Sequence, residues 1–183
     1  MNKKLEVDLR PKEKPPPKEI KPKIRQKRVV TTTDGWATRA TDTNSPDIQY
    51  EIVQHIRGNS VPEFREPIKT LILQQITQKI GGYKSQDMEK ELFLEAEFVD
   101  MEKVLDLMIE SENQCFYCKN RVHILYEYVR EPNQWTLERI DNKAGHNKTN
   151  VVIACLNCNL HRRTMYHERY VFTKQLNIVK REN

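Results

Sequence analysis

Two pairs of closely spaced cysteines constrain this chain more than any other feature of its sequence. Cys115 and Cys118 form one pair, Cys155 and Cys158 form the other, and the chain has no further cysteine. Four thiolates suit the tetrahedral coordination of Zn²⁺, and a CxxC pair places two of them on one ion with little strain. The spacing therefore predicts one zinc ion held by all four cysteines. The alternative is two unrelated pairs of buried cysteines.

A zinc site with four cysteine ligands has no open position for water or substrate, so we expect this ion to be structural. It would tie the segment 115–118 to a helix that follows Cys155, and it would keep a short α+β unit folded. The N-terminus, MNKKLEVDLRPKEK, lacks the apolar stretch of a signal peptide, and no apolar run reaches transmembrane length. We therefore expect an intracellular chain, in cytoplasm or nucleus, whose paired cysteines bind metal and do not form disulfides.

The basic charge of the chain is concentrated at its N-terminus. The net charge is +5, with 31 basic and 26 acidic residues. Residues 1–28 contain eleven Lys or Arg, four Asp or Glu and five of the nine prolines, which leaves 20 basic and 22 acidic residues in the remainder. Such a composition predicts a disordered, basic, Pro-rich tail over residues 1–45. Two readings stay open: an arm that contacts nucleic acid or an acidic protein partner, and a solvated tail or linker.

Residues 46–112 have the pattern of a helical region. Apolar residues at helical spacing predict a helix over Pro46–Arg57. A second helix is predicted from Pro62 to the pair Gly81-Gly82, which is expected to end it, and a third from near Ser85. A fourth is predicted over Asp100–Glu112, with Asp100 as its N-cap. We interpret the apolar faces of these helices as core.

The pattern changes from Gln114 onward to short strands followed by a helix. Strands are predicted over 122–129 (VHILYEYV), 135–141 (WTLERID) and 151–154 (VVIA), and a helix is predicted to begin in CLNCNLHRR. The expected fold is therefore α+β. It consists of a helical region over 46–112, a zinc-stapled module over 113–166 and a C-terminal extension over 167–183.

The segment 135–163, taken together with Cys115–Cys118, resembles the HNH endonucleases. It looks closest to their four-cysteine branch, which includes the phage recombination endonucleases of type VII. The resemblance implies a ββα module with a catalytic divalent cation separate from the zinc, and hydrolysis of DNA phosphodiester bonds. It also implies DNA as partner, a homodimer, and a phage or large DNA virus as source.

The resemblance assigns roles to individual residues. Asn159, directly after Cys158, matches the asparagine that binds the catalytic metal, and Asn150 matches the central asparagine that braces the loop. Glu138 falls where the family has a carboxylate or histidine ligand of the metal. Arg139 departs from the pattern, because the family has its general-base histidine at that position and arginine cannot be deprotonated in a protein.

The chemistry of the residues points the same way. Glu138, Asp141 and Asn159 offer oxygen ligands suited to Mg²⁺ or Mn²⁺. His146 titrates near neutral pH and could accept a proton from water in place of the missing histidine, and Asp141 is the other candidate base. Phosphates could be held by five cations: Arg139, Lys143, Lys148, Arg162 and Arg163.

Each of these residues also has a simpler interpretation. Asp141 and Asn142 are typical of a turn. His146, next to a glycine in a polar loop, is in the simpler view an exposed polar residue. Arg162 and Arg163 are in that view the solvated face of a helix.

Three functions are compatible with these patterns. The first, which we favour, is a metal-dependent endonuclease that acts on DNA. The second is a catalytically inactive zinc module that binds nucleic acid or assembles with proteins, and Arg139 favours it. The third is a structural component of a larger particle, such as a virus particle, in which the tail runs along neighbouring subunits.

Overall fold

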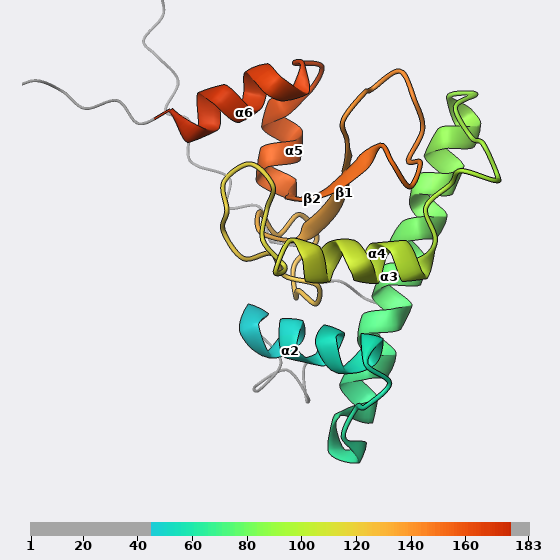
Figure 1. Cartoon of the computed structure of the whole chain (residues 1–183), viewed down its shortest axis with the longest axis vertical. Helices are drawn as coiled ribbons and strands as arrows, with labels where there is room; N and C mark the ends of the chain where they lie inside the picture. The colour runs from blue at the N-terminus through green and yellow to red at the C-terminus, as the bar shows by residue number, and fades with distance from the viewer. Residues whose placement is uncertain (1–44, 177–183) are drawn as a thin grey trace, which may run out of the picture.

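A computed structural model describes residues 45–176 of the chain (Figure 1). The predicted tail over 1–45 lies outside the described residues except for Ser45, and so do residues 177–183 of the predicted extension. The elements are α2 (Pro46–Arg57), the short 3₁₀ helix η1 (Glu63–Arg65), α3 (Glu66–Glu89), α4 (Met101–Glu110), β1 (Trp135–Arg139), β2 (Val151–Cys155), α5 (Leu156–Arg162) and α6 (His167–Gln175). Helices combined with a small antiparallel sheet agree with the predicted α+β class. Within 45–176, no helix has both the length and the apolar character to cross a bilayer.

The first and fourth predicted helices are confirmed as α2 and α4. In α2, Ile52 and Val53 are fully buried. Asp100 caps α4, since its side chain accepts a hydrogen bond from the Lys103 N–H at 2.9 Å. Arg57 and Asp106 join the two helices through an ion pair of 2.6 Å. Local periodicity and a cap signal were enough to locate both helices.

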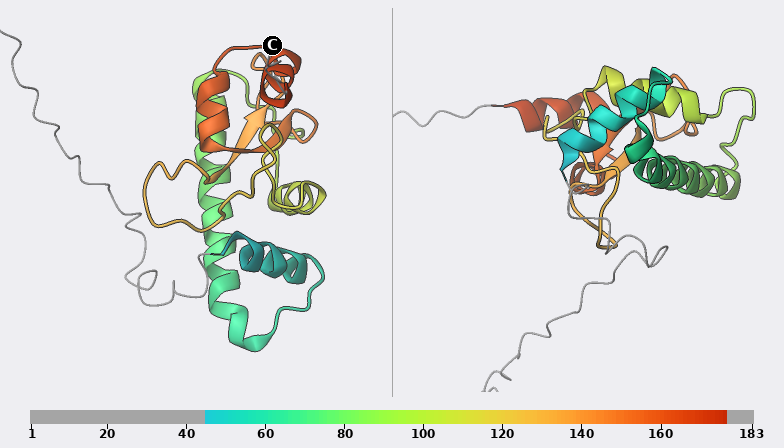
Figure 2. Two further views of the ribbon diagram at one scale, coloured as in Figure 1. Left: turned by 90° about the vertical axis from the view of Figure 1, so that its left-hand side faces the viewer. Right: turned by 90° about the horizontal axis from the view of Figure 1, so that it is seen from below.

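The predicted break at Gly81-Gly82 is wrong, because α3 continues through both glycines to Glu89. Glycine costs a helix about 1 kcal/mol relative to alanine but does not forbid it, and neither glycine has a positive φ. Contacts on both sides of the pair hold the helix: Lys79 donates to the backbone carbonyl of Trp135, and Asp87 accepts from the backbone N–H of His146. As a result α3 lies alongside both α2 and the sheet (Figure 2).

The predicted strand over 122–129 is also wrong. Val122, Ile124, Leu125 and Tyr126 are buried and Val129 is exposed, but the backbone is irregular and forms no strand. The buried side chain of Gln49, from α2, takes the place of a neighbouring strand. Its Oε1 accepts from the N–H groups of Ile124 and Leu125 at 2.7 and 3.0 Å, and its Nε2 donates to the Leu125 carbonyl at 3.2 Å.

The other two predicted strands are confirmed as β1 and β2. They pair antiparallel, with Trp135 opposite Cys155 and Arg139 opposite Val151. Since side chains alternate along a strand, Thr136 and Glu138 lie on the same face of β1. The helix α5 begins directly after Cys155, as predicted, and it packs against β1 and β2. This packing brings α5 beside the polar face of β1.

The helix α6 lies within the region predicted only as an extension. It has no side-chain cap, and Tyr170 is its only buried residue among those described. The Tyr170 ring packs edge-on against Tyr117, with 4.8 Å between the centroids. This contact holds α6 against the segment that carries the first cysteine pair.

Candidate metal centre and adjoining cleft

The four cysteines converge as the spacing predicts. Their Sγ atoms all lie within 4.8 Å of one another, and Cys118 Sγ is 3.9 Å from Cys155 Sγ. A tetrahedral zinc ion with Zn–S bonds of about 2.3 Å requires sulfur–sulfur separations of about 3.8 Å. The cluster is therefore compatible with a structural zinc ion.

Backbone hydrogen bonds shape each cysteine pair. Lys119, with φ of 60°, closes the first turn by donating its N–H to the Cys115 carbonyl at 2.9 Å. In the second pair, the Cys158 N–H donates to Cys155 Sγ at 3.3 Å. The Phe116 N–H donates to the Ile153 carbonyl at 2.8 Å, which joins the first pair to β2. The folded backbone thus brings the two pairs together.

The electrostatics of the cluster favour a cation. The hydrogen bond from Cys155 lowers the pKa of Cys115 to about 5, and sharing that proton with Cys115 raises the pKa of Cys155. Burial raises the pKa of Cys158 to about 11. Four thiolates could not share this buried place without a positive ion, and a bound zinc ion would displace their protons.

A polar cleft of about 270 Å³ lies between α3, β1 and α5. It is lined by five of the predicted site residues: Glu138, Arg139, His146, Asn159 and Arg163. They come from β1, from the loop that follows it and from α5. The fold therefore brings the predicted metal ligands Glu138 and Asn159 and the predicted base His146 to one place.

The side-chain amide of Asn159 has a defined orientation. Thr136 donates its hydroxyl proton to the Ala154 carbonyl at 2.9 Å, so its Oγ1 can only accept from Asn159, at 3.2 Å. The Nδ2 of Asn159 therefore faces Thr136. Its Oδ1 has no hydrogen-bond partner among residues 45–176. Since Thr136 and Glu138 share a face of β1, this oxygen belongs to the same side of the sheet as the carboxylate.

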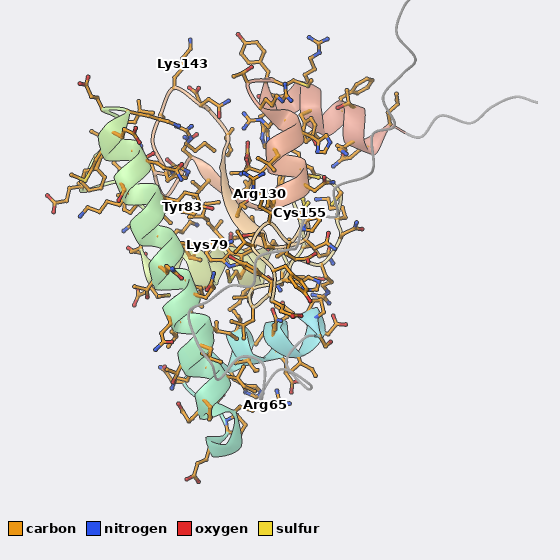
Figure 3. All side chains as sticks on the ribbon, turned by 180° about the vertical axis from the view of Figure 1, so that it is seen from behind. Arg65, Lys79, Tyr83, Arg130, Lys143 and Cys155 are labelled. Atoms are coloured by element: carbon orange, nitrogen blue, oxygen red, sulfur yellow. The ribbon has the colours of Figure 1, made fainter. Side chains whose placement is uncertain are left out.

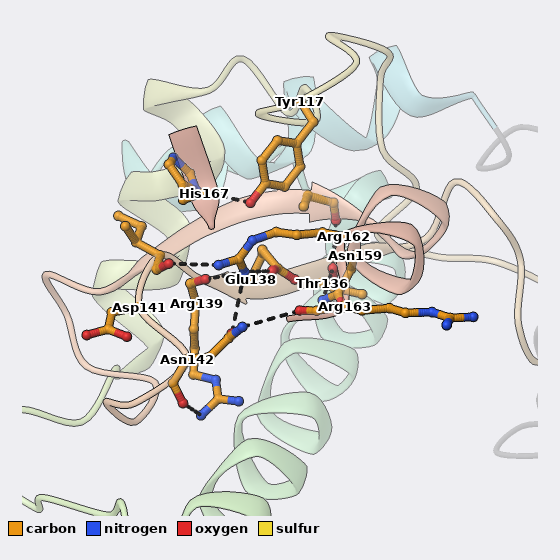
Figure 4. A network of polar contacts seen from close by, with 12 residues as sticks. Tyr117, Thr136, Glu138, Arg139, Asp141, Asn142, Asn159, Arg162, Arg163 and His167 are labelled. Atoms are coloured by element: carbon orange, nitrogen blue, oxygen red, sulfur yellow. Dashed lines mark hydrogen bonds and ion pairs between the residues drawn. The ribbon is translucent and has the colours of Figure 1, made fainter. Parts of the chain in front are cut away.

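Glu138 is paired with Arg162 in the interior (Figure 4). The guanidinium of Arg162 donates to Glu138 Oε1 and to the carbonyls of Arg139 and Ile140, the last two at 2.6 and 2.8 Å. Burial raises the pKa of the Glu138 carboxyl, and Arg162 opposes this shift. Arg162 is only 2% exposed. The prediction that Arg162 contacts phosphate is therefore wrong, because its head group faces inward and holds the end of β1.

His146 forms a buried dyad with Asp87. Its Nδ1 lies 2.8 Å from Asp87 Oδ1, and its backbone N–H donates to Asp87 Oδ2 at 2.5 Å. The ring of Tyr83 packs on the imidazole, with 4.4 Å between the centroids. Burial lowers the pKa of His146, and Asp87 acts in the opposite direction. The simpler interpretation of His146 as an exposed loop residue is wrong, since it is 4% exposed.

Gly145 allows this dyad to form. A Cβ at this position would lie 2.5 Å from the Leu92 carbonyl oxygen and 2.8 Å from Asp87 Oδ2. Only glycine lets the loop approach α3 so closely. Sequence reasoning missed Asp87 and Tyr83, because they lie on α3, far upstream of the motif, and no local pattern marks them.

Two predicted residues lie away from the cleft. Asp141 Oδ1 accepts a hydrogen bond from the Lys143 N–H at 2.9 Å, which agrees with the simpler interpretation of Asp141 as a turn residue. Asp141 does not line the cleft, and Figure 4 shows it apart from Glu138. Asn150 Oδ1 accepts a hydrogen bond from the Asp141 N–H, and Asn150 Nδ2 donates to the carbonyls of Asp141 and Gly145, each at 2.9 Å. Asn150 thus braces the loop, as the resemblance implies.

The remaining predicted phosphate contacts are spread around the loop. Arg139 donates to the carbonyls of Asn142 and Ala144 at 3.3 and 3.1 Å. Lys148 pairs with Asp100 at 2.6 Å. Lys143 projects outward from the loop (Figure 3). Arg163 is exposed and lines the cleft, which makes it the best placed of the five for a phosphate.

The chain matches no protein-family model, and comparisons with curated proteins and with solved structures find no match. The functional argument therefore rests on the geometry of this site.

Proposed function

We propose that this chain is a metal-dependent endonuclease of the HNH type that hydrolyses phosphodiester bonds in DNA. The observation that supports it best is the meeting of Glu138, His146 and Asn159 in one cleft. They come from three parts of the module, namely β1, the loop that follows it and α5. The four-cysteine cluster supports the same proposal, because Cys158 directly precedes Asn159 and a structural zinc site would fix the start of α5.

Glu138 and Asn159 would hold the catalytic cation. A carboxylate oxygen and an amide oxygen are ligands that Mg²⁺ and Mn²⁺ accept, and Asn159 Oδ1 makes no hydrogen bond to any residue of 45–176. When bound, the cation supplies the positive charge that neutralises phosphate oxygens during hydrolysis. Asp141 is left out of this set, because its carboxylate serves the turn at Lys143.

His146 would act as the general base. Its Nδ1 is held by Asp87, which leaves Nε2 as the nitrogen that can accept a proton from water. The lowered pKa of His146 keeps the imidazole neutral near pH 7, which is the state a base requires. Asp87 would be a positioning residue, and Arg163 would contact a phosphate at the rim.

A cleavage assay with matched variants tests the proposal. We expect Mg²⁺ or Mn²⁺ to support nicking of supercoiled, linear or branched DNA, and we expect His146→Ala and Asn159→Ala to abolish it. The controls are His161→Ala and Asn157→Ala, which change exposed residues on α5 that do not line the cleft. Parent protein that leaves all three DNA forms intact with either metal would rule the proposal out.

A second candidate function is a catalytically inactive zinc module that binds nucleic acid or assembles with proteins, for example in a virus particle. The buried ion pair favours it, because Arg162 already neutralises the Glu138 carboxylate that a cation would need. This candidate predicts salt-dependent nucleic-acid binding or a protein complex without cleavage. Removal of residues 1–28 would show whether the basic tail is the contact.

A further inference from the structure

A second cavity, of about 510 Å³, adjoins the proposed catalytic cleft. The two share Tyr83, Gln86 and Asn159 as lining residues. Its volume lies within the range of about 300–1,000 Å³ that is usual for sites of small ligands. A nucleotide whose phosphate lies in the cleft would therefore have its sugar and base close to the mouth of this cavity.

The floor of the cavity offers hydrogen-bonding groups that the protein does not use. Gln75 and Gln134 are buried at 6% and 8% exposure. Gln75 Nε2 donates to the Tyr126 hydroxyl at 2.9 Å, and Gln134 Oε1 accepts from Lys79 at 3.1 Å. Within 45–176, Gln75 Oε1 and Gln134 Nε2 have no partner. The floor thus presents an acceptor and a donor, which is the combination that the polar edge of a base requires.

The charge and the rings around the cavity also favour a flat, electron-rich ligand. Among the residues that line it, none is Asp or Glu, and the exposed Arg130 supplies a positive charge (Figure 3). The Lys79 ammonium lies 5.0 Å from the centre of the Tyr126 ring. With Tyr83, the cavity has two aromatic side chains on which a base could stack.

We infer that this cavity receives an unpaired nucleobase of the DNA whose phosphate the cleft binds. The inference rests on the proposed function and adds to its cleft a second site, which binds the base of a nucleotide that is unpaired there. A base in a duplex keeps its faces stacked and its pairing edge occupied, so it cannot reach buried groups such as Gln134. A base that has left the stack exposes its faces and its pairing edge. The free-energy cost of leaving the stack is lowest for a base that is already unpaired.

The two glycines of α3 provide a blocking variant and its control. Gly82 lines the cavity, and a Cβ added there meets no atom within 4 Å. A Cβ at Gly81 also meets nothing within 4 Å, but Gly81 does not line the cavity. Gly82→Trp should therefore fill the cavity, and Gly81→Trp should leave it open. Both changes fall within a helix and neither glycine has a positive φ, so both variants should fold.

The test compares binding of two fluorescent DNA duplexes that differ by one bulged nucleotide, without added divalent cation. We expect the parent and Gly81→Trp to bind the bulged duplex about 5- to 150-fold more tightly than the paired one, the range that stacking of one base supports. Gly82→Trp should lose this preference. With 2-aminopurine as the bulged base, its fluorescence should change on binding to the parent and stay unchanged with Gly82→Trp.

The outcomes separate this inference from the proposed activity. Equal affinity of the parent for both duplexes, or a preference that persists in folded Gly82→Trp, would overturn the inference even if DNA is cut. Preference for the bulge without any cleavage would reject the nuclease and uphold the base-binding cavity.

Discussion

At the scale of single residues, the orientation of the Asn159 amide depends on one hydroxyl group. Thr136→Val keeps the shape of the side chain but removes the acceptor that fixes Asn159 Nδ2. One such hydrogen bond contributes about 1 kcal/mol, so we expect the Mg²⁺ concentration that gives half-maximal cleavage to rise roughly fivefold in this variant. Thr136→Ser keeps the hydroxyl and should behave as the parent. A metal titration of the cleavage rate that is unchanged in Thr136→Val would contradict this role.

Gly145 gives a second prediction at this scale. An alanine methyl would collide with the Leu92 carbonyl oxygen at 2.5 Å, and the backbone cannot move without disturbing Asp87 and His146. We expect Gly145→Ala to lower the free energy of unfolding by about 1–3 kcal/mol, as overpacking does. Gly81→Ala, in open space on α3, should raise it by about 0.5–1 kcal/mol. Urea unfolding of the two variants should therefore shift in opposite directions.

The buried ammonium of Lys79 makes stability depend on pH. Burial lowers the pKa of Lys79 from its ordinary value of 10.5 to about 7, and the group has no carboxylate partner in the described part of the chain. Between pH 7 and 10.5 the unfolded chain binds more protons at this site than the folded chain, so stability rises with pH there. Below pH 7 both states are protonated and the cost of burial is fully present.

Lys79→Met removes this titration. Between pH 7 and pH 8.5 the parent should gain about 1–2 kcal/mol of unfolding free energy relative to Lys79→Met, since one pKa unit corresponds to about 1.4 kcal/mol. Urea unfolding of both proteins at the two pH values measures the difference. Parallel changes in the two proteins would show that Lys79 is charged throughout this range.

At the scale of elements, α2 supports an irregular segment of the core through Gln49. Gln49→Ala would leave two N–H groups and one carbonyl at Ile124 and Leu125 without their partner. Unsatisfied buried groups cost about 1–3 kcal/mol each, so for three groups we expect the free energy of unfolding to fall by at least about 3 kcal/mol in thermal or urea unfolding. Gln54→Ala, on the exposed side of α2, should change stability by less than about 0.5 kcal/mol. Similar stabilities of the two variants would contradict this account.

The same elements show which features the sequence could predict. The helix α2, the helix α4 and the strands β1 and β2 follow from local periodicity and capping, because each buries one regular face. The irregular backbone of 122–129 depends on its hydrogen bonds to the Gln49 side chain. The continuity of α3 through its two glycines depends on the contacts of Lys79 and Asp87. Such contacts join residues far apart in the chain, so no local pattern reveals them.

In the candidate site, too, some features could be predicted from the sequence and others depend on tertiary contacts. The cysteine spacing was sufficient to predict the four-cysteine cluster. The motif pointed to Glu138 and Asn159, and side-chain chemistry pointed to His146, which lines the same cleft. The pairing of Glu138 with Arg162 and of His146 with Asp87 was not predicted. Arg162 and Asp87 are charged residues, which are ordinarily found at the surface, and only the tertiary packing buries them.

At the scale of the whole molecule, one hydrophobic core joins the helical region to the four-cysteine cluster. Ile52 of α2, Ile72 of α3 and Val104 of α4 belong to the same buried cluster as Cys115, Cys155 and Cys158. Because the core is continuous, loss of the metal should not stay local. We therefore expect metal binding and the folding of residues 45–176 to be one cooperative event.

Removal of zinc tests this coupling. Structural zinc sites contribute on the order of 10 kcal/mol to folding, which is comparable to the whole stability of a domain of about 5–15 kcal/mol. Purified protein should therefore contain one zinc per chain, and a strong chelator should abolish its cooperative thermal transition in circular dichroism. Cys158→Ser should lose the metal and the transition together, whereas Ser85→Ala, at an exposed site on α3, should keep both. A metal-free protein with an unchanged transition would show that the four thiols are ordinary core residues, and the proposed function would then lose the support of a structural zinc site.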